Sequence, residues 1–335
     1  MIQKFDISNF GPITHLRATD LQNINLVIGR NGSGKTILLK ALYAAIKTIE
    51  QYKRGRDVRT DKDILADKLR WTFQAQVLKN IIKNGESRLS FQMVSSDNET
   101  FEYSFGTSTT KEISNLTNTF APRPSDNSVF IPAKEVLSLR NIILKWKNQF
   151  SDFGFDDTFV DLASALTPTD SMRSYNGFTS DHKELEQIMG GRLEYDKEYN
   201  EWMFKDKNNK KIEISLTAEG IKKLSIIDLL LGNHYLNENS VIFIDEIEAN
   251  LHPELIYDFL SIIVHLAKAG IQFFISTHSY FVIKSLYILA HTENIHIPTI
   301  SIESDNILQS DLFDEMPSNP IIGESINLYK REISL

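Results

Sequence analysis

The sequence contains no cysteine among its 335 residues. This absence excludes disulfide bonds, zinc sites with cysteine ligands and thiol catalysis, and it fits a reducing compartment. Long apolar runs are missing as well. The longest, residues 224–231 and 281–290, are too short and too polar to span a bilayer. No secretory signal is visible, because residues 1–6 lead into a mixed polar stretch. We therefore expect a soluble, cytoplasmic protein with no membrane partner.

The chain also lacks a surplus of positive charge. Its 36 Lys and Arg residues stand against 44 Asp and Glu, which gives a net charge of -8. A protein whose main task is gripping a phosphate backbone usually shows a basic surplus. Local basic runs at residues 53–59 and 205–211 are more typical of solvated loops than of binding patches. Composition therefore does not indicate nucleic acid, whereas a hydrophobic content of 41% allows a sizeable core.

The most informative motif is the phosphate loop, or Walker A pattern, G-x-x-x-x-G-K-[ST] at residues 29–36. Glycines at this spacing let successive backbone N–H groups point at an anion. Lys35 would place its charge near the β- and γ-phosphates, and the Thr36 hydroxyl would bind Mg²⁺. Residues 24–28 predict a buried strand before the loop, and residues 37–46 predict a helix whose N-terminal dipole favours phosphate. The loop residues expected to contact the nucleotide are Asn31, Gly32, Ser33, Gly34, Lys35 and Thr36.

A second motif has the Walker B form, in which an apolar strand ends in two carboxylates. Residues 241–244 are continuously apolar, as a buried parallel strand should be, and they lead into Asp245 and Glu246. Asp245 would hold Mg²⁺ directly or through water, and Glu246 would deprotonate the attacking water. After one predicted helix, a strand at residues 271–275 delivers His278. A lone histidine there is more often structural, but after a Walker B strand it is expected to sense the γ-phosphate.

The rest of the chain predicts a mixed α/β protein without repeats or heptad arrays. Alternating apolar residues around polar turns predict hairpins at residues 89–105 and 192–216. Helical spacing covers residues 61–82 and 135–150, and residues 151–180 are rich in loop-forming side chains.

Taken in this order, the motifs resemble the ABC-type ATPase heads of the RecF/SMC-like group, in particular the ATPase modules of OLD-like proteins. The resemblance implies an α/β fold of the P-loop NTPase class. It takes the form of a two-lobed head with a mixed central sheet, an antiparallel β subdomain and a helical lobe. The segments that carry the resemblance are residues 7–13, 29–36, 130–138, 217–224, 245–253 and 277–279.

The resemblance also implies how the chain is divided. A single ATPase domain would cover residues 1–335, with lobe I at about 1–130 and 236–310, lobe II at about 131–235, and a tail at 311–335. OLD-like enzymes carry a C-terminal nuclease domain. We expect none here, because the residues that follow His278 are too few for a domain of ordinary size.

In such proteins two heads close face to face, and each ATP lies between one phosphate loop and the partner's signature helix. The resemblance places Gly220 at the N-terminus of that helix, facing the partner's γ-phosphate, and Asn250 in the loop that crosses the dimer interface. It makes His278 the switch histidine and puts Glu135 or Lys134 near the segment that couples ATP to the second lobe. Ala218 replaces a signature serine, so the helix N-terminus and not a hydroxyl is expected to bind the phosphate.

The function that fits best is an Mg²⁺-dependent ATPase that converts ATP and water to ADP and phosphate, with Lys35, Glu246 and His278 as catalytic residues. It would act as an ATP-bound homodimer that controls a separate effector, as in bacterial antiphage defence or toxin-like systems. Residues 141–200 and 316–335 are the candidate partner contacts. The alternative is a RecF-like DNA repair or recombination ATPase, against which the acidic charge counts. A transporter subunit and an inactive scaffold fit the motifs less well.

Overall fold

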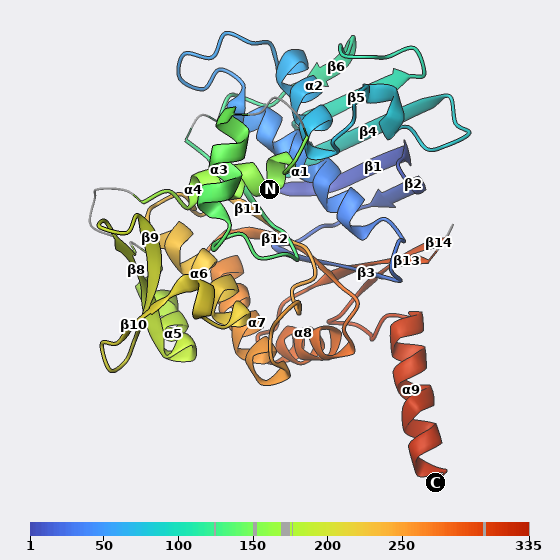
Figure 1. Cartoon of the computed structure of the whole chain (residues 1–335). Coiled ribbons are helices and arrows are strands. Elements are labelled where there is room, and N and C mark those ends of the chain that lie inside the picture. Colours follow the sequence, from blue (N-terminus) through green and yellow to red (C-terminus); the bar gives the residue numbers. More distant parts are fainter. Residues whose placement is uncertain (124, 150–152, 169–174, 176, 304–305, 335) are drawn as a thin grey trace.

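The computed structural model describes residues 1–335 except 124, 150–152, 169–174, 176, 304–305 and 335. Its centre is a six-stranded sheet with the strand order β14-β13-β3-β12-β11-β7 (Figure 1). Neighbouring strands run parallel except for the edge pair of β13 and β14, so the sheet is mixed. The bounds are β3 Ile24–Gly29, β7 Val129–Ile131, β11 Val241–Ile244, β12 Gln272–Thr277, β13 Pro298–Glu303 and β14 Asn306–Asp311.

This strand order determines where the functional loops meet. Strand β12 lies between β3, which leads into the phosphate loop, and β11, which carries the acidic motif. The carboxyl ends of parallel strands open at the same edge of a sheet. Residues 29–36, 245–253 and 277–279 therefore gather at one edge, each at the end of its own strand.

Both faces of the central sheet are covered, which explains the continuous apolar runs of its strands. On one face, Phe243 and Phe274 pack against helix α1 and the five-stranded sheet. On the other face, Ile242, Ile244 and Phe273 pack against helices α6, α7 and α8. Figure 1 shows these two layers above and below the central strands. The helices span α1 Lys35–Gln51, α6 Glu219–Gly232, α7 Pro253–Lys268 and α8 Tyr280–Thr292.

A separate five-stranded antiparallel sheet has the order β2-β1-β4-β5-β6. It contains the hairpin predicted at residues 89–105, in which Phe91 pairs with Tyr103 and Met93 with Phe101. Because alternate residues face the core, one side of this sheet is apolar and the other polar. The bounds are β1 Ile2–Phe10, β2 Ile13–Ala18, β4 Arg88–Ser95, β5 Thr100–Gly106 and β6 Asn115–Asn118.

A smaller antiparallel sheet of order β10-β9-β8 confirms the hairpin predicted at residues 192–216. Its strands are β8 Gly191–Asp196, β9 Glu201–Asp206 and β10 Lys211–Glu213, and a short 3-10 helix, η2, covers Ile214–Leu216. Helices α3 Arg140–Gln149 and α5 Thr179–Met189 lie in the same part of the sequence.

The predictions for residues 135–150, expected to be a helix, and 151–180, expected to be rich in loops, are wrong in detail. Helix α4, Asp157–Ala165, lies inside the stretch expected to be loop-rich, and the Asp156 carboxylate caps it by accepting the Thr158 N–H at 2.8 Å. The helix expected over residues 135–150 begins only at Arg140. Other residues of these two predictions, 150–152, 169–174 and 176, lie outside the described part of the chain.

The helix expected over residues 61–82 is also shorter, because a left-handed residue ends it. Helix α2 spans Asp61–Thr72, and Gln74 follows with φ 50°. The Ala75 N–H bonds back to the Arg70 carbonyl at 2.9 Å, which closes the turn as a Schellman motif. A short 3-10 helix, η1 Leu78–Ile81, replaces the rest.

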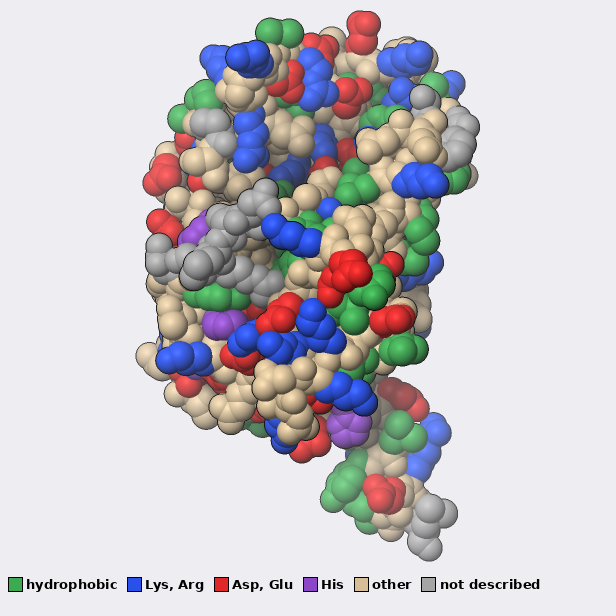
Figure 2. Space-filling model, turned by 60° about the vertical axis from the view of Figure 1, so that its left-hand side comes forward, with side chains coloured by type: hydrophobic (Ala, Val, Ile, Leu, Met, Phe, Trp, Pro, Cys, Tyr) green, Lys and Arg blue, Asp and Glu red, His purple; other side chains and the backbone are tan. Residues whose placement is uncertain are grey.

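The last helix, α9 Pro320–Ile333, projects from the body of the molecule (Figure 1). It has no buried residue, and Figure 2 shows exposed apolar side chains along it. No helix in the described part of the chain is long and apolar enough to cross a membrane. The lobe boundaries that we expect from the sequence stay a prediction.

A buried charge network joins helix α1 to α2 and α4. The Lys68 ammonium lies 3.0 Å from Asp157 and 2.8 Å from Asp161, and all three side chains are largely buried. The Tyr43 hydroxyl donates to the same Asp161 carboxylate at 2.7 Å. The helix that follows the phosphate loop is therefore tied to α4 through Tyr43, and α4 is tied to α2 through Lys68.

We expect Lys68→Ala to lower the free energy of unfolding by about 3 kcal/mol. It removes the cation that bonds Asp161 and leaves Asp157 only the more distant Lys147 at 3.6 Å. Urea unfolding followed by circular dichroism measures this change. Lys62→Ala is the matched control, since Lys62 is an exposed lysine on the same helix. Equal stability of the two variants would contradict the assignment.

Candidate functional site

The phosphate loop turns directly from β3 into helix α1, and the start of the helix is left open. Gly34 is the N-cap residue with φ 103°, no side chain caps the helix, and its first turn contains no acidic residue. A Cβ at Gly34 would lie 3.0 Å from Ile13 Cγ1, so both the backbone angle and the space require glycine. The first N–H groups of α1 have no partner within the helix and are available for an anion.

Lys35 is buried beneath the loop, with a side chain held by the loop's own backbone. Its Nζ donates to the Gly29 carbonyl at 2.8 Å and to the Arg30 carbonyl at 3.0 Å. Burial lowers the pKa of Lys35, although the negative charges of Glu246 and Asp245 act in the opposite direction. An ammonium group has three N–H donors, so one remains for a phosphate oxygen.

The rest of the loop also fits a phosphate. The Ser33 hydroxyl is buried and has no hydrogen-bond partner within the described chain. A buried hydroxyl without a partner costs free energy, and a phosphate oxygen would satisfy it. Asn31 and Gly32 lie exposed at the tip of the loop, where Gly32 has φ 78°.

The hydroxyl of Thr36 joins the phosphate loop to the acidic motif. Thr36 Oγ1 lies 2.9 Å from Asp245 Oδ2 and 3.0 Å from Oδ1, although their strands are separated by β12. Ser276, at the end of β12, completes the arrangement by donating its hydroxyl to Asp245 Oδ1 at 2.6 Å.

A hydroxyl and a carboxylate are the oxygen ligands that Mg²⁺ takes beside a phosphate loop. Thr36 and Asp245 therefore fit this ion. Among the described residues, His, Asp and Glu form no group of three or more that could hold a metal ion. This fits an ion held by few protein ligands together with phosphate oxygens.

Glu246 follows Asp245 in an unusual backbone conformation. Its φ of 48° is left-handed, which costs free energy for a residue other than glycine and is often found at functional sites. Its N–H donates to the Ser276 hydroxyl at 2.9 Å, so one serine contacts both Asp245 and Glu246. The Glu246 side chain stays 36% exposed, which leaves its carboxylate accessible to water.

His278 lies between two carboxylates. Its Nδ1 is 3.5 Å from Glu246 Oε1 and 3.3 Å from Glu248 Oε1. Glu248 is held in turn, because it accepts the Thr277 hydroxyl at 2.8 Å and the His278 N–H at 2.9 Å. The structure thus brings His278 and Glu246 together, and it adds Glu248 as a residue that orients the loop after β12. The roles expected for His278 and Glu246 stay predictions.

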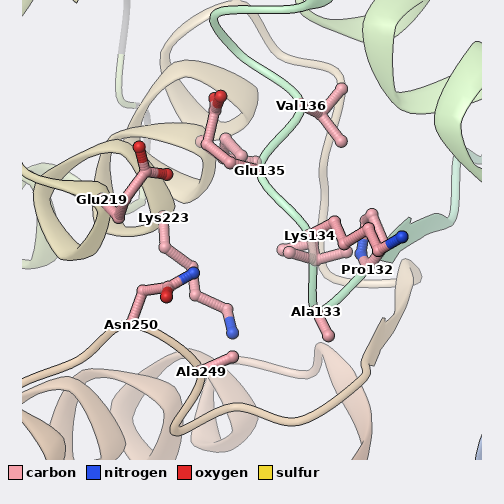
Figure 3. Close-up of a pocket in the computed structure, with 11 residues that line it drawn as sticks. Pro132, Ala133, Lys134, Glu135, Val136, Glu219, Lys223, Ala249 and Asn250 are labelled. Atoms are coloured by element: carbon pink, nitrogen blue, oxygen red, sulfur yellow. The ribbon is translucent and has the colours of Figure 1, made fainter. Parts of the chain in front are cut away.

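The remaining candidates form a second group at another place. Glu135 and Asn250 line one pocket between residues 131–136, helix α6 and the loop after β11 (Figure 3). Gly220 packs tightly there, because a Cβ would lie 3.1 Å from the Asn250 carbonyl oxygen. Within the described chain, no hydrogen bond or ion pair joins these three residues to Lys35, Thr36 or Asp245.

Two residues of this group, Asn250 and Glu135, differ in exposure. Asn250 is exposed and has φ 64°, so its side chain can reach beyond its own chain. Glu135 instead accepts the Ser138 N–H at 2.8 Å, and burial raises the pKa of its carboxyl group. The role that the resemblance implies for Glu135 stays a prediction.

Helix α6 also lacks a side-chain cap, but unlike α1 it has an acidic residue, Glu219, in its first turn, which pairs with Lys222 at 2.7 Å. Its N-cap residue is Ala218, which offers no side-chain acceptor, and both Ala218 and Glu219 are exposed. The nearby Thr217 hydroxyl donates to the Glu213 carbonyl at 3.1 Å and does not cap the helix. The start of α6, like that of α1, therefore leaves backbone N–H groups without a side-chain acceptor.

Three residues of the site were not predicted. Ser276 and Glu248 lie within segments that the sequence marks as informative, but their contacts depend on the sheet order. Lys223 links the two groups, because its Nζ donates to the Glu246 carbonyl at 2.8 Å and to the Ile247 carbonyl at 3.2 Å. Burial lowers the pKa of Lys223 to about 8, partly offset by Glu248.

The fold is similar to that of Smc head domains. The chain superposes on the crystal structure of an Smc head bound to the C-winged helix domain of ScpA with a TM-score of 0.57. The sequence identity is 14%, and the match covers 93% of this chain and 98% of that chain. A Pyrococcus furiosus Smc head with an extended coiled coil, bound to the C-terminal domain of ScpA, has a TM-score of 0.54 at 12% identity, over 100% and 99%. These likenesses confirm the predicted ATPase-head fold, whereas the resemblance to OLD-like proteins stays a prediction.

No curated protein matches the sequence. A family model described as "AAA domain, putative AbiEii toxin, Type IV TA system" matches residues 24–284. The matched region includes the phosphate loop, the acidic motif and His278, so it covers all the loops that meet at the edge of the central sheet. This supports the prediction of a P-loop ATPase of the AAA and Smc-head type. The chain belongs to this AAA domain family.

Proposed function

We propose that the protein is an Mg²⁺-dependent ATPase that dimerises when it binds ATP and thereby controls a separate effector protein. The observation that carries this proposal is that the residues expected to contact ATP lie in two separate groups. The phosphate loop, Asp245, Glu246 and His278 form one group, and the open N-terminus of α6 forms the other. A second copy related by two-fold symmetry would bring its α6 to the phosphate loop, and the same contact would complete both sites.

Within such a site, each residue has a separate task. Lys35 and the open N-terminus of α1 would bind the β- and γ-phosphates. Thr36 and Asp245 would hold Mg²⁺, which, when bound, neutralises phosphate charge. Glu246 would accept a proton from the attacking water, and His278, between Glu246 and Glu248, would donate a hydrogen bond to the γ-phosphate.

The effector role rests on other observations. The family description refers to a toxin of a toxin-antitoxin system, which supports a defence or toxin-linked role. The Smc heads of similar fold are bound to domains of ScpA, which supports an ATPase head that contacts a second protein. Helix α9, with exposed Ile326, Leu328, Tyr329 and Ile333, is the surface that we propose for such a contact. The RecF-like alternative is less well supported, because the net charge is -8.

We expect Lys35→Ala to weaken ATP binding by at least about tenfold, because the buried ammonium would no longer neutralise phosphate charge. Titration with a fluorescent ATP analogue measures the affinity, and the melting temperature shows whether the variant is folded. Unchanged affinity in a folded variant would contradict the role of Lys35.

Glu246→Gln should reduce the ATP hydrolysis rate by about 100-fold or more, because an amide is unable to accept the proton. Since ATP would still bind, the variant should accumulate as an ATP-bound dimer. Sedimentation with ATP and Mg²⁺ would show a doubled mass. The control is Glu254→Gln, an exposed glutamate on α7, which should behave as the unmodified protein. A Glu246→Gln protein that stays monomeric with ATP would reject the dimer proposal.

The partner role of α6 can be tested with charge alone. Asp and Asn cap a helix N-terminus about equally well, so Ala218→Asp and Ala218→Asn differ mainly in charge. We expect Ala218→Asp to repel the partner's phosphate and abolish ATP-dependent dimerisation in the Glu246→Gln background, with ATP affinity of the monomer retained. Ala218→Asn should still dimerise. If both variants dimerise equally, α6 does not face a phosphate.

A further inference from the structure

Lys223 reaches from helix α6 into the loop that follows β11. Figure 3 shows its side chain extending from the helix toward Ala249. Its Nζ donates to two backbone carbonyls, those of Glu246 at 2.8 Å and Ile247 at 3.2 Å. The residue is only 7% exposed, and no carboxylate in the described chain lies within ion-pair distance of it.

A buried ammonium without an ion-pair partner is costly. Taking a charge out of water is unfavourable unless hydrogen bonds or an opposite charge compensate. Here the compensation comes from two neutral carbonyls, together with the more distant negative charges of Glu248 and Asp245. An apolar side chain would fill the same space without this cost. The lysine therefore points to a task that packing alone does not explain.

The carbonyls that Lys223 holds belong to the residue proposed as the base and to its neighbour. The N–H of Glu246 donates to the Ser276 hydroxyl, and its carbonyl accepts from Lys223. The left-handed backbone of Glu246 is thus held by β12 on one side. On the other side, its carbonyl accepts from Lys223 of α6 and from the Ala249 N–H of its own loop at 2.9 Å. Because this conformation is unfavourable in isolation, it depends on such contacts.

The same helix carries the open N-terminus. Ala218 is the N-cap residue of α6 and provides no side-chain cap, and Gly220 packs against the Asn250 carbonyl. Lys223 follows Gly220 by three residues, about one helical turn along the axis. A helix moves as a rigid element over this distance. A shift of its N-terminus would therefore displace the Lys223 ammonium and the carbonyls that it holds.

We propose that Lys223 is a positioning residue that couples α6 to Glu246. An anion bound at the N-terminus of α6 then fixes, through Lys223, the backbone conformation of Glu246 in the same chain. In the proposed dimer, on which this inference rests, that anion is the phosphate bound by the partner. The ATP bound by the second copy thereby prepares the first copy for hydrolysis, and the two sites act together.

The test compares steady-state ATP hydrolysis by three variants of the full chain. Lys223→Met keeps the length of the side chain and removes its donors, and Lys223→Arg keeps the charge and the donors. Lys268→Met is the control, because Lys268 is an exposed lysine at the end of α7 that pairs with Glu293 at 2.6 Å, away from the α6 N-terminus. The melting temperature of each variant shows that it is folded.

We expect Lys223→Met to lower kcat by about tenfold or more while KM for ATP stays within about twofold, because nucleotide contacts remain intact. Lys223→Arg should recover most of the loss, and Lys268→Met should keep its kcat. In the Glu246→Gln background, Lys223→Met should still dimerise with ATP, since positioning acts after assembly.

Three results would overturn the inference. They are an unchanged kcat in Lys223→Met, an equal loss in Lys223→Arg, and a loss that appears only in KM. If Lys223→Met does not fold, Lys223→Leu, which also removes the donors, replaces it under the same criteria. Failure of Glu246→Gln itself to dimerise would instead reject the proposed function, so the two failures are distinguishable.

Discussion

The site depends on the hydrogen bond between the Thr36 hydroxyl and the Asp245 carboxylate. It joins the start of helix α1, which follows β3, to the residue that follows β11, across the end of β12. Ser276 at the end of β12 bonds the same carboxylate and accepts the Glu246 N–H, so three adjacent strands are held together at one edge. The phosphate loop, the metal ligands and the proposed base are thereby placed within one small region before any nucleotide arrives.

In the proposed dimer, this region is only one half of the chemistry. Helix α6 presents an uncapped N-terminus elsewhere on the chain, and Lys223 connects that helix to the base through the Glu246 carbonyl. A rigid helix with an anion site at its start and a base-holding lysine one turn later is a simple coupling element. A symmetric dimer would use it twice, which accounts for a composite site without any additional domain.

Sequence patterns predict the parts of this structure that depend on local signals. Strands β3 and β11 are identifiable because both faces of the sheet are buried, and Lys35, Thr36, Asp245 and Glu246 follow from motif spacing. Helix α4 was missed because its signal is a single capping residue, Asp156, in a polar stretch. Ser276 and Lys223 were missed because their partners are 31 and 23 residues away and only the sheet order and helix packing bring them together.

The central claim is that each active site contains parts of two chains, and mixing two defective variants tests it most directly. Lys35→Ala lacks a working phosphate loop, whereas Ala218→Asp lacks a working α6 N-terminus, so each should be inactive alone. A mixed dimer would contain one intact site, so an equal mixture should hydrolyse ATP faster than the sum of the two variants, with about a quarter of full activity as the upper limit. Because the base of that site has no phosphate at its own α6, the coupling through Lys223 predicts a rate about tenfold below this limit. Activity that stays at the sum of the two separate variants, when a mixed dimer forms, would contradict the account.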